Sequence, residues 1–203
     1  MSSIRDETYI FLDTCSLLES SWNRKGNSFV FDAQKDRRFW QTEMQSLMNA
    51  GSVILPVRNY EELIKHAHAL DDPSRPHLRE RSECVLTRID ELRDRGDITL
   101  VGDANDPFAD AILLSVALKF RTTKNLLFLT QDRNLATDLI TIASFKSVRP
   151  RRGHELKVRR LNREGIIEPW HLRSSTHKPS QPQGSQPARK STDHTTFLER
   201  WWK

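Results

Sequence analysis

Four carboxylates in this 203-residue sequence stand where predicted strands end or predicted helices begin. Asp13 ends the apolar run in YIFLDTCSLL, Glu62 follows VILP, Asp110 lies in NDPFADAILLSVAL, and Asp132 follows LLFLT. An ionised carboxylate at the end of a buried strand needs hydrogen bonds, a counter-charge or a metal, because an unpaired buried charge costs several kcal/mol. We therefore expect these acids to have partners elsewhere in the chain.

Convergent carboxylates repel one another, and a hard divalent cation removes that repulsion. Mg²⁺ prefers oxygen ligands and is often held by a few carboxylates together with water and phosphate oxygens. Such a cation activates water and neutralises charge on a phosphodiester in the transition state. A set of carboxylates without His or Cys ligands thus favours phosphate chemistry over a zinc site. The alternative for any single acid is a helix cap or an arginine pair.

The elements that must position these acids alternate between strands and helices. Short apolar runs of strand length occupy residues 9–12, 52–57, 98–101 and 126–130, and longer patterns of helical spacing occupy residues 38–50, 76–95 and 107–120. This alternation predicts an α/β fold, a three-layer α/β/α sandwich around a mostly parallel sheet. Ligands of such sheets bind at the carboxyl ends of the strands, the edge to which all four acids are assigned.

These segments together resemble a PIN domain, a metal-dependent ribonuclease fold of bacterial toxins and RNA-processing enzymes. FLDTCSLL resembles the opening strand with its Asp-Thr motif, and ILPVRNYEEL resembles the second strand followed by Glu-Leu. ADAILLSVAL resembles the helix that begins with Asp, and FLTQDRNL resembles the strand that ends in Thr-x-Asp. The resemblance covers residues 8–148 and rests on the order of four motifs that are each weak alone.

The resemblance implies a set of functional residues. It assigns Asp13, Glu62, Asp110 and Asp132 as catalytic metal ligands for Mg²⁺, with Mn²⁺ as a substitute, and Thr130 and Thr14 as polar supports. Glu61 and Asp106 are rivals for the second and third acids. We prefer Glu62, because Leu63 follows it as in the family, and we keep Asp106 as an auxiliary ligand or helix cap.

Cys15 departs from the family, which commonly has Asn or Ser at its position. It also argues against two other sites that contain an aspartate after a strand. A haloacid-dehalogenase-type phosphatase needs a second aspartate at position 15, and a MIDAS-type adhesion site needs serines where Cys15 and Leu17 stand. Cys15 as a nucleophile is the remaining alternative, but surrounding carboxylates would raise its pKa.

The implied reaction is hydrolysis of RNA. An activated water attacks phosphorus in line, and the family leaves 5′-phosphate and 3′-hydroxyl ends. We expect the substrate to be single-stranded or looped RNA, cut by a metal-dependent endoribonuclease. The alternative is a catalytically inactive PIN-like module that binds RNA or protein. Toxin, defence nuclease and RNA-maturation enzyme all fit the same acids, and the size of the chain favours a toxin, with an antitoxin as its partner.

The positive charge of the chain is concentrated in one segment. Residues 146–163 hold eight basic residues and one acid, a net charge of +7, whereas the whole chain carries +5. Such a cluster suits a polyanion, and the affinity for RNA should fall as salt rises. We assign RNA-backbone contacts to this segment and to the end of the fourth strand, through Arg133, Arg149, Arg151 and Arg152.

The rest of the chain predicts one domain with a tail. We place the domain at residues 1–172, a disordered linker at residues 173–196 and an aromatic motif at residues 197–203. Phe197, Leu198, Trp201 and Trp202 form an apolar face that either docks on the domain or binds a protein partner or a second copy in a homo-oligomer. Without a signal peptide, a membrane span or more than two cysteines, the expected compartment is the cytoplasm. His66 and His68 lie on different helix faces and are expected at the surface.

Overall fold

The computed structural model describes residues 8–26, 28–68, 76–103, 109–145 and 154–171. The chain divides into two units, Met1–Trp170 and His171–Lys203, and all described residues except His171 belong to the first unit. Several predictions fall outside these residues. They concern the disordered linker, part of the basic segment and, among the named residues, Asp106, Arg149, Arg151, Arg152, Phe197, Leu198, Trp201 and Trp202.

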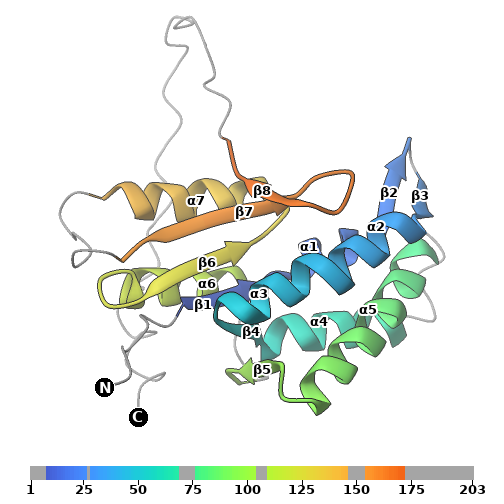
Figure 1. Ribbon diagram of the computed structural model, residues 1–203, viewed down its shortest axis with the longest axis horizontal. Helices are drawn as coiled ribbons and strands as arrows, with labels where there is room; N and C mark the ends of the chain where they lie inside the picture. Colours follow the sequence, from blue (N-terminus) through green and yellow to red (C-terminus); the bar gives the residue numbers. More distant parts are fainter. Residues whose placement is uncertain (1–7, 27, 69–75, 104–108, 146–153, 172–203) are drawn as a thin grey trace, which may run out of the picture. The chain divides into compact units, whose positions relative to one another are not determined.

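A six-stranded sheet forms the centre of the described structure, and Figure 1 shows its strands. Five strands are parallel to one another and the sixth is antiparallel. Their order across the sheet is β5 (Ile98–Val101), β4 (Ser52–Pro56), β1 (Thr8–Leu12), β6 (Asn125–Leu129), β7 (Leu156–Leu161) and β8 (Ile167–Pro169). The predicted α/β class with a mostly parallel sheet flanked by helices is confirmed.

Both faces of the sheet are covered at its central strands, which explains why β1, β4 and β6 are mainly apolar. Ile10 and Leu12 pack into one core with helices from the first hundred residues, whereas Phe11 stacks on Phe128 with ring centroids 5.1 Å apart. Successive side chains of a strand point to opposite faces, so Phe11 belongs to the other core. A strand that is covered on both faces has no polar side, so its sequence does not alternate between apolar and polar residues.

Helices form a layer on each face of the sheet. One layer contains α1 (Thr14–Glu19), α2 (Ala33–Arg38), the π-helix η1 (Phe39–Glu43), α3 (Met44–Ala50), α4 (Val57–His68) and α5 (Pro76–Asp94). The other contains α6 (Ala109–Phe120) and α7 (Arg133–Ser144), which lie beside β6 and β7 in Figure 1. These two layers and the sheet make the predicted three-layer sandwich.

The strand order creates a position for a ligand between β1 and β6. From β1 the chain moves outward to β4 and β5, and it then crosses β1 to form β6 and β7 on the other side. The helices that follow β1 and β6 therefore diverge to opposite faces. Sheets of this kind bind ligands outside the carboxyl ends of the strands at such a switch point. Asp13 follows β1 and Asp132 closely follows β6, so both acids lie there.

The observed elements extend the predicted ones. The four predicted strands correspond to β1, β4, β5 and β6 with ends shifted by at most one residue. The helix predicted from residue 38 begins earlier, at Ala33, because Asp32 caps it by accepting hydrogen bonds from the backbone of Gln34 and Lys35. The sequence prediction also missed a two-stranded hairpin, β2 (Trp22–Lys25) and β3 (Ser28–Phe31), together with β7 and β8.

Gly51 allows β4 to lie against β1. A Cβ atom at this position would meet the backbone oxygen of Thr8 at 2.1 Å, a distance that real structures do not contain. A side chain there would therefore push apart β1, which is followed by Asp13, and β4, which leads into α4.

Within the described residues, no helix is both long and apolar enough to cross a membrane.

Candidate functional site

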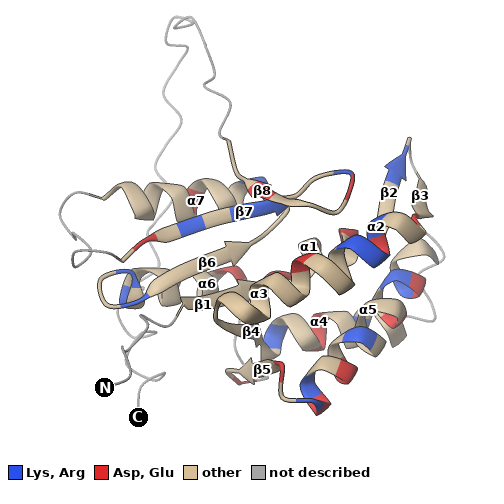
Figure 2. Ribbon diagram, in the orientation of Figure 1, with Lys and Arg blue, Asp and Glu red and all other residues tan. Residues whose placement is uncertain are grey.

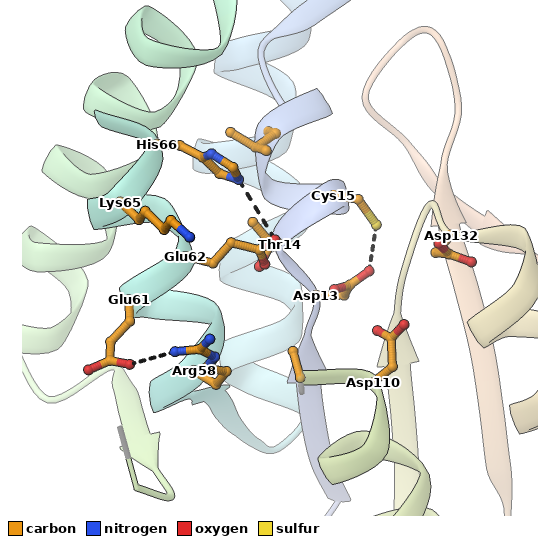
Figure 3. Close-up of a pocket in the computed structure, with 12 residues that line it drawn as sticks. Asp13, Thr14, Cys15, Arg58, Glu61, Glu62, Lys65, His66, Asp110 and Asp132 are labelled. Carbon is orange, nitrogen blue, oxygen red and sulfur yellow. Dashed lines mark hydrogen bonds and ion pairs between the residues drawn. The ribbon is translucent and has the colours of Figure 1, made fainter. Parts of the chain in front are cut away.

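A cavity of about 410 Å³ opens at the carboxyl edge of the sheet. Figure 3 shows side chains from the end of β1 and from α1, α4, α6 and the start of α7 around it. Its lining consists of Asp13, Thr14, Cys15, Leu18, Arg58, Glu61, Glu62, Lys65, His66, Ala109, Asp110 and Asp132. The structure thus brings together all four predicted acids, although they come from parts of the chain more than a hundred residues apart.

Asp13 is the buried centre of this site. Its Oδ2 atom accepts hydrogen bonds from Thr130 Oγ1 at 2.6 Å and from the Cys15 thiol, and its Oδ1 atom accepts one from Asn59 Nδ2 at 3.2 Å. Burial raises the pKa of Asp13, the bonds from Cys15 and Thr130 act in the opposite direction, and the charge of Glu62 raises it further. The carboxylate is therefore fixed in orientation by hydrogen bonds to both of its oxygens.

Asn59 is a residue of the site that the sequence prediction missed. It is fully buried in the first turn of α4, where its Nδ2 atom donates both to Asp13 and to Thr14 Oγ1, at 2.9 Å. Its Oδ1 atom has no hydrogen-bond partner in the described structure. This amide fixes the start of α4 to the end of β1, and Glu62 lies one helical turn further along α4.

Glu62 and Glu61 both line the cavity, but they differ in their partners. Glu61 pairs with Arg58 at 3.4 Å, whereas Glu62 lies 3.7 Å from His66. The charge of Glu62 is among the main causes of the raised pKa values of both Asp13 and Asp110, and Glu61 is not among them. Of the two neighbours, Glu62 is the one that is electrostatically coupled to the other acids.

Asp110 extends from the first turn of α6 toward Asp13 (Figure 3). Burial and then the charges of Asp13, Asp132 and Glu62 raise the pKa of Asp110 to about 6. Each of the three remaining acids acts on this one carboxylate. Mutual repulsion of this kind is the signature of acids gathered around a position that a cation would neutralise.

Asp132 has a structural role as well as a place in the cavity. It caps α7, since its Oδ1 atom accepts hydrogen bonds from the backbone of Asn134 at 2.6 Å and Leu135 at 3.0 Å. Its backbone donates to Thr130 Oγ1 at 3.0 Å, and Thr130 in turn donates to Asp13. Thr130 therefore links two of the acids. The helix-cap alternative for a single acid holds for Asp132, whose Oδ2 atom has no partner among the described residues.

Cys15 takes part in the same network. Its thiol donates to Asp13, lies 3.5 Å from Thr130 Oγ1, and accepts a hydrogen bond from the backbone of Gln131 at 3.2 Å. Burial, followed by the charge of Asp13, raises the pKa of Cys15 far above its usual range. A protonated thiol is a poor nucleophile, so these contacts argue against nucleophilic catalysis by Cys15.

The donors of the cavity suit a hard cation, although they do not form a finished coordination shell. In the part of the chain that the structure describes, no three His, Cys, Asp or Glu side chains are arranged to hold a metal ion. Mg²⁺ commonly keeps several water ligands and needs only one or two carboxylates directly. Asp13, Glu62, Asp110 and Asp132 supply oxygen donors and negative charge, which is the chemistry that such an ion requires.

The remaining predicted residues lie around this cavity or outside the described structure. Arg133 is exposed at the first residue of α7 and does not line the cavity. The described part of the basic segment contains β7, whose Lys and Arg residues are coloured in Figure 2. Of the two histidines predicted at the surface, His68 is exposed and His66 is a partly buried residue of the cavity wall.

No protein-family model matches this chain, and no curated protein sequence matches it significantly.

Proposed function

We propose that the protein is a metal-dependent endoribonuclease with the carboxylate cavity as its active site. One observation carries the proposal: four acids from four separate elements line one cavity at the switch point of a parallel sheet. Isolated caps or surface pairs would be distributed over the fold. Here Asp13, Asp132 and Glu62 each raise the pKa of Asp110 instead, and carboxylates perturbed in this way cluster at functional sites.

The proposed cofactor is Mg²⁺, with Mn²⁺ as a substitute. When bound, the ion would make a water molecule more nucleophilic and offset the charge that develops on a phosphodiester. Asp13, Glu62, Asp110 and Asp132 would hold it. Asn59 and Thr130 orient Asp13 through hydrogen bonds to its two oxygens, and Thr130 also receives the backbone donor of Asp132.

Family membership and biological role are part of the same proposal. The four motifs that resemble a PIN domain contribute one acid each to the cavity. We place the protein in that family and in the cytoplasm, as a toxin, a defence nuclease or an RNA-maturation enzyme. Arg133 and the basic segment that includes β7 are proposed to contact the RNA backbone, and an antitoxin or a second copy of the chain to bind the aromatic motif.

A PIN-like module that binds RNA or protein without cutting is the second candidate. It is favoured by the Asp13 carboxylate, which already accepts hydrogen bonds from Asn59, Thr130 and Cys15. These bonds satisfy much of a buried carboxylate without any cation. The two candidates differ in whether RNA is hydrolysed.

The test measures cleavage of single-stranded and hairpin RNA with Mg²⁺, with Mn²⁺ and with a chelator. Asp13→Asn and Asp110→Asn should each reduce cleavage by at least about a hundredfold, since each removes a charged metal ligand. Asp94→Asn is the matched control, because Asp94 is exposed, does not line the cavity and, among the described residues, pairs only with Arg93. Equal cleavage by the wild-type protein and both site variants would exclude this site, and RNA binding without cleavage would select the second candidate.

A further inference from the structure

The cavity contains basic side chains that the proposed metal chemistry leaves unexplained. Arg58, Lys65 and His66 lie along one side of α4, and all three line the cavity that contains the four acids. Asn59, Leu63 and Ala67 lie on another side of the helix, where they are buried and do not line the cavity. The rotation of the helix therefore presents Arg58, Lys65 and His66, together with Glu61 and Glu62, to the cavity.

One side of the cavity is acidic, whereas the α4 side carries both signs of charge. Asp13, Asp110 and Asp132 line the cavity from β1, α6 and α7, and Figure 3 shows Arg58 and Lys65 on the α4 side beside Glu61 and Glu62. Basic groups disfavour a cation, so a pocket for a metal ion alone gains nothing from them. A ligand that carries a phosphate beside the metal uses both sides, because the phosphate oxygens accept hydrogen bonds from Arg and Lys.

The basic side chains are free to exchange their partners. Arg58 pairs with Glu61 at 3.4 Å and its side chain is 42% exposed, so this ion pair is worth at most about 1 kcal/mol. Lys65 is exposed and has no ion pair within the described residues. Figure 3 shows its amino group directed toward the cavity. A phosphate would replace only a weak contact of Arg58 and none of Lys65.

The size of the cavity fits part of a polynucleotide. Its volume of about 410 Å³ lies at the low end of the ligand pockets of proteins, about 300–1,000 Å³. A single nucleotide unit and the phosphate of the next unit can occupy such a space, whereas a folded RNA domain cannot. Lys65 lines the cavity and is exposed to solvent, so a strand that contacts it can continue beyond the cavity.

We infer that Arg58 and Lys65 form a phosphate subsite that holds an RNA phosphodiester adjacent to the one positioned at the carboxylates. This inference rests on the proposed function, and it specifies the substrate: a chain with at least two successive phosphates instead of a mononucleotide. The subsite contacts the backbone and does not read bases. It is separate from Arg133 and from β7, neither of which lines the cavity.

The test compares four variants in binding to a fluorescent single-stranded RNA at several salt concentrations. Arg58→Gln and Lys65→Ala remove the subsite, and Arg79→Gln and Lys25→Ala are matched controls. Arg79 forms an exposed ion pair with Glu83 at 2.9 Å, Lys25 is exposed on β2, and neither lines the cavity. Ca²⁺ replaces Mg²⁺ in this assay, since it is also a hard cation that takes oxygen ligands.

The expected result is weaker binding by both subsite variants to RNAs of any sequence. The slope of log affinity against log salt should become shallower by about 0.7 for each lost phosphate contact, and the controls should keep the wild-type slope. A neutral methylphosphonate at the position that the subsite holds should weaken binding by the wild-type protein more than binding by Lys65→Ala, which has already lost one of the two contacts. The subsite would be overturned if the slope of log affinity against log salt were equal in all four variants, or if all four lost the same amount of affinity for RNA.

Cleavage with Mg²⁺, measured separately, distinguishes this inference from the proposed function. If both hold, Lys65→Ala raises KM and changes kcat little, because the contact is made before as well as during reaction. If the wild-type protein cuts no RNA but binding depends on Arg58 and Lys65, the subsite stands and the nuclease proposal fails. If RNA is cut while binding and KM are independent of both residues, the subsite fails and the nuclease proposal stands.

Discussion

The side-chain amide of Asn59 donates to Asp13 Oδ1 at 3.2 Å and so joins the start of α4 to the end of β1. The same nitrogen donates to Thr14 at 2.9 Å, and Asn59 is fully buried. Because Glu62 follows on the next turn of α4, this amide sets the position of one acid relative to another. It is a positioning residue for the carboxylates and not a candidate ligand in our proposal.

Asn59→Ala should therefore affect both stability and metal binding. Losing the donor leaves a buried Asp13 oxygen without its partner, which should lower the free energy of unfolding by about 1–3 kcal/mol. Residues that orient metal ligands typically change affinity by about 10–100-fold, and we expect a loss in this range for Mn²⁺. Urea unfolding and calorimetric titration measure the two effects. Asn49→Ala, at an exposed site on α3, should change neither, and unchanged Mn²⁺ affinity in Asn59→Ala would reduce Asn59 to a structural role.

Asp110→Asn should stabilise the metal-free protein above pH 6 while abolishing cleavage. At that pH the ionised Asp110 is repelled by Asp13, Asp132 and Glu62, which with burial raise its pKa to about 6. A neutral amide removes the repulsion. Solvent screens this partly exposed group, so we expect a rise in Tm of only about 1–3 °C. Scanning calorimetry at pH 8 checks it, with Asp94→Asn as control, and a lower Tm for Asp110→Asn would contradict the repulsion.

Stability should depend on pH through the same carboxylate, in opposite directions without and with metal. Asp110 has a folded-state pKa of about 6 against an ordinary value of 3.8, so between these values the folded protein binds the extra proton. The contribution of Asp110 to the stability of the metal-free protein is complete below pH 3.8 and is lost as pH rises through 6. Mg²⁺ binds the ionised form, so the increase in Tm that Mg²⁺ causes should grow from pH 5 to pH 7. A constant increase across that range would show that Asp110 does not bind the ion.

Cys15 should be unreactive in the folded protein. Burial and the charge of Asp13 raise its pKa far above the usual range, so almost no thiolate is present at pH 8. Alkylation by iodoacetamide, followed by mass spectrometry of the peptide that contains Cys15, should be much slower in the native protein than in urea. Similar rates in both states would contradict the assigned thiol hydrogen bond. Cys15→Ser keeps a donor to Asp13 and should retain most of the cleavage activity, whereas Cys15→Val should not.

Several features of the protein could be predicted from the sequence alone because their causes are local. Continuous apolar runs define β1, β4, β5 and β6, and the strand ends are marked by the residues that break each run. The carboxyl ends of parallel strands share one edge, so the order of the motifs was enough to place four acids together. The same reasoning could not find β7, since Lys157, Arg159 and Arg160 interrupt its apolar pattern and its stability comes from pairing with β6 and β8.

The tertiary structure alone decided which other side chains reach the site. Asn59, Arg58 and Lys65 are ordinary polar residues of a helix, and only the rotation of α4 against the sheet buries the first and turns the others toward the cavity. Cys15, which the family resemblance left unexplained, donates to Asp13 and accepts from the backbone beyond β6. The order of the motifs in the sequence determined which acids lie together, because the carboxyl ends of parallel strands converge at one edge of the sheet. Packing determined their partners, because hydrogen bonds across more than forty residues depend on how the layers meet.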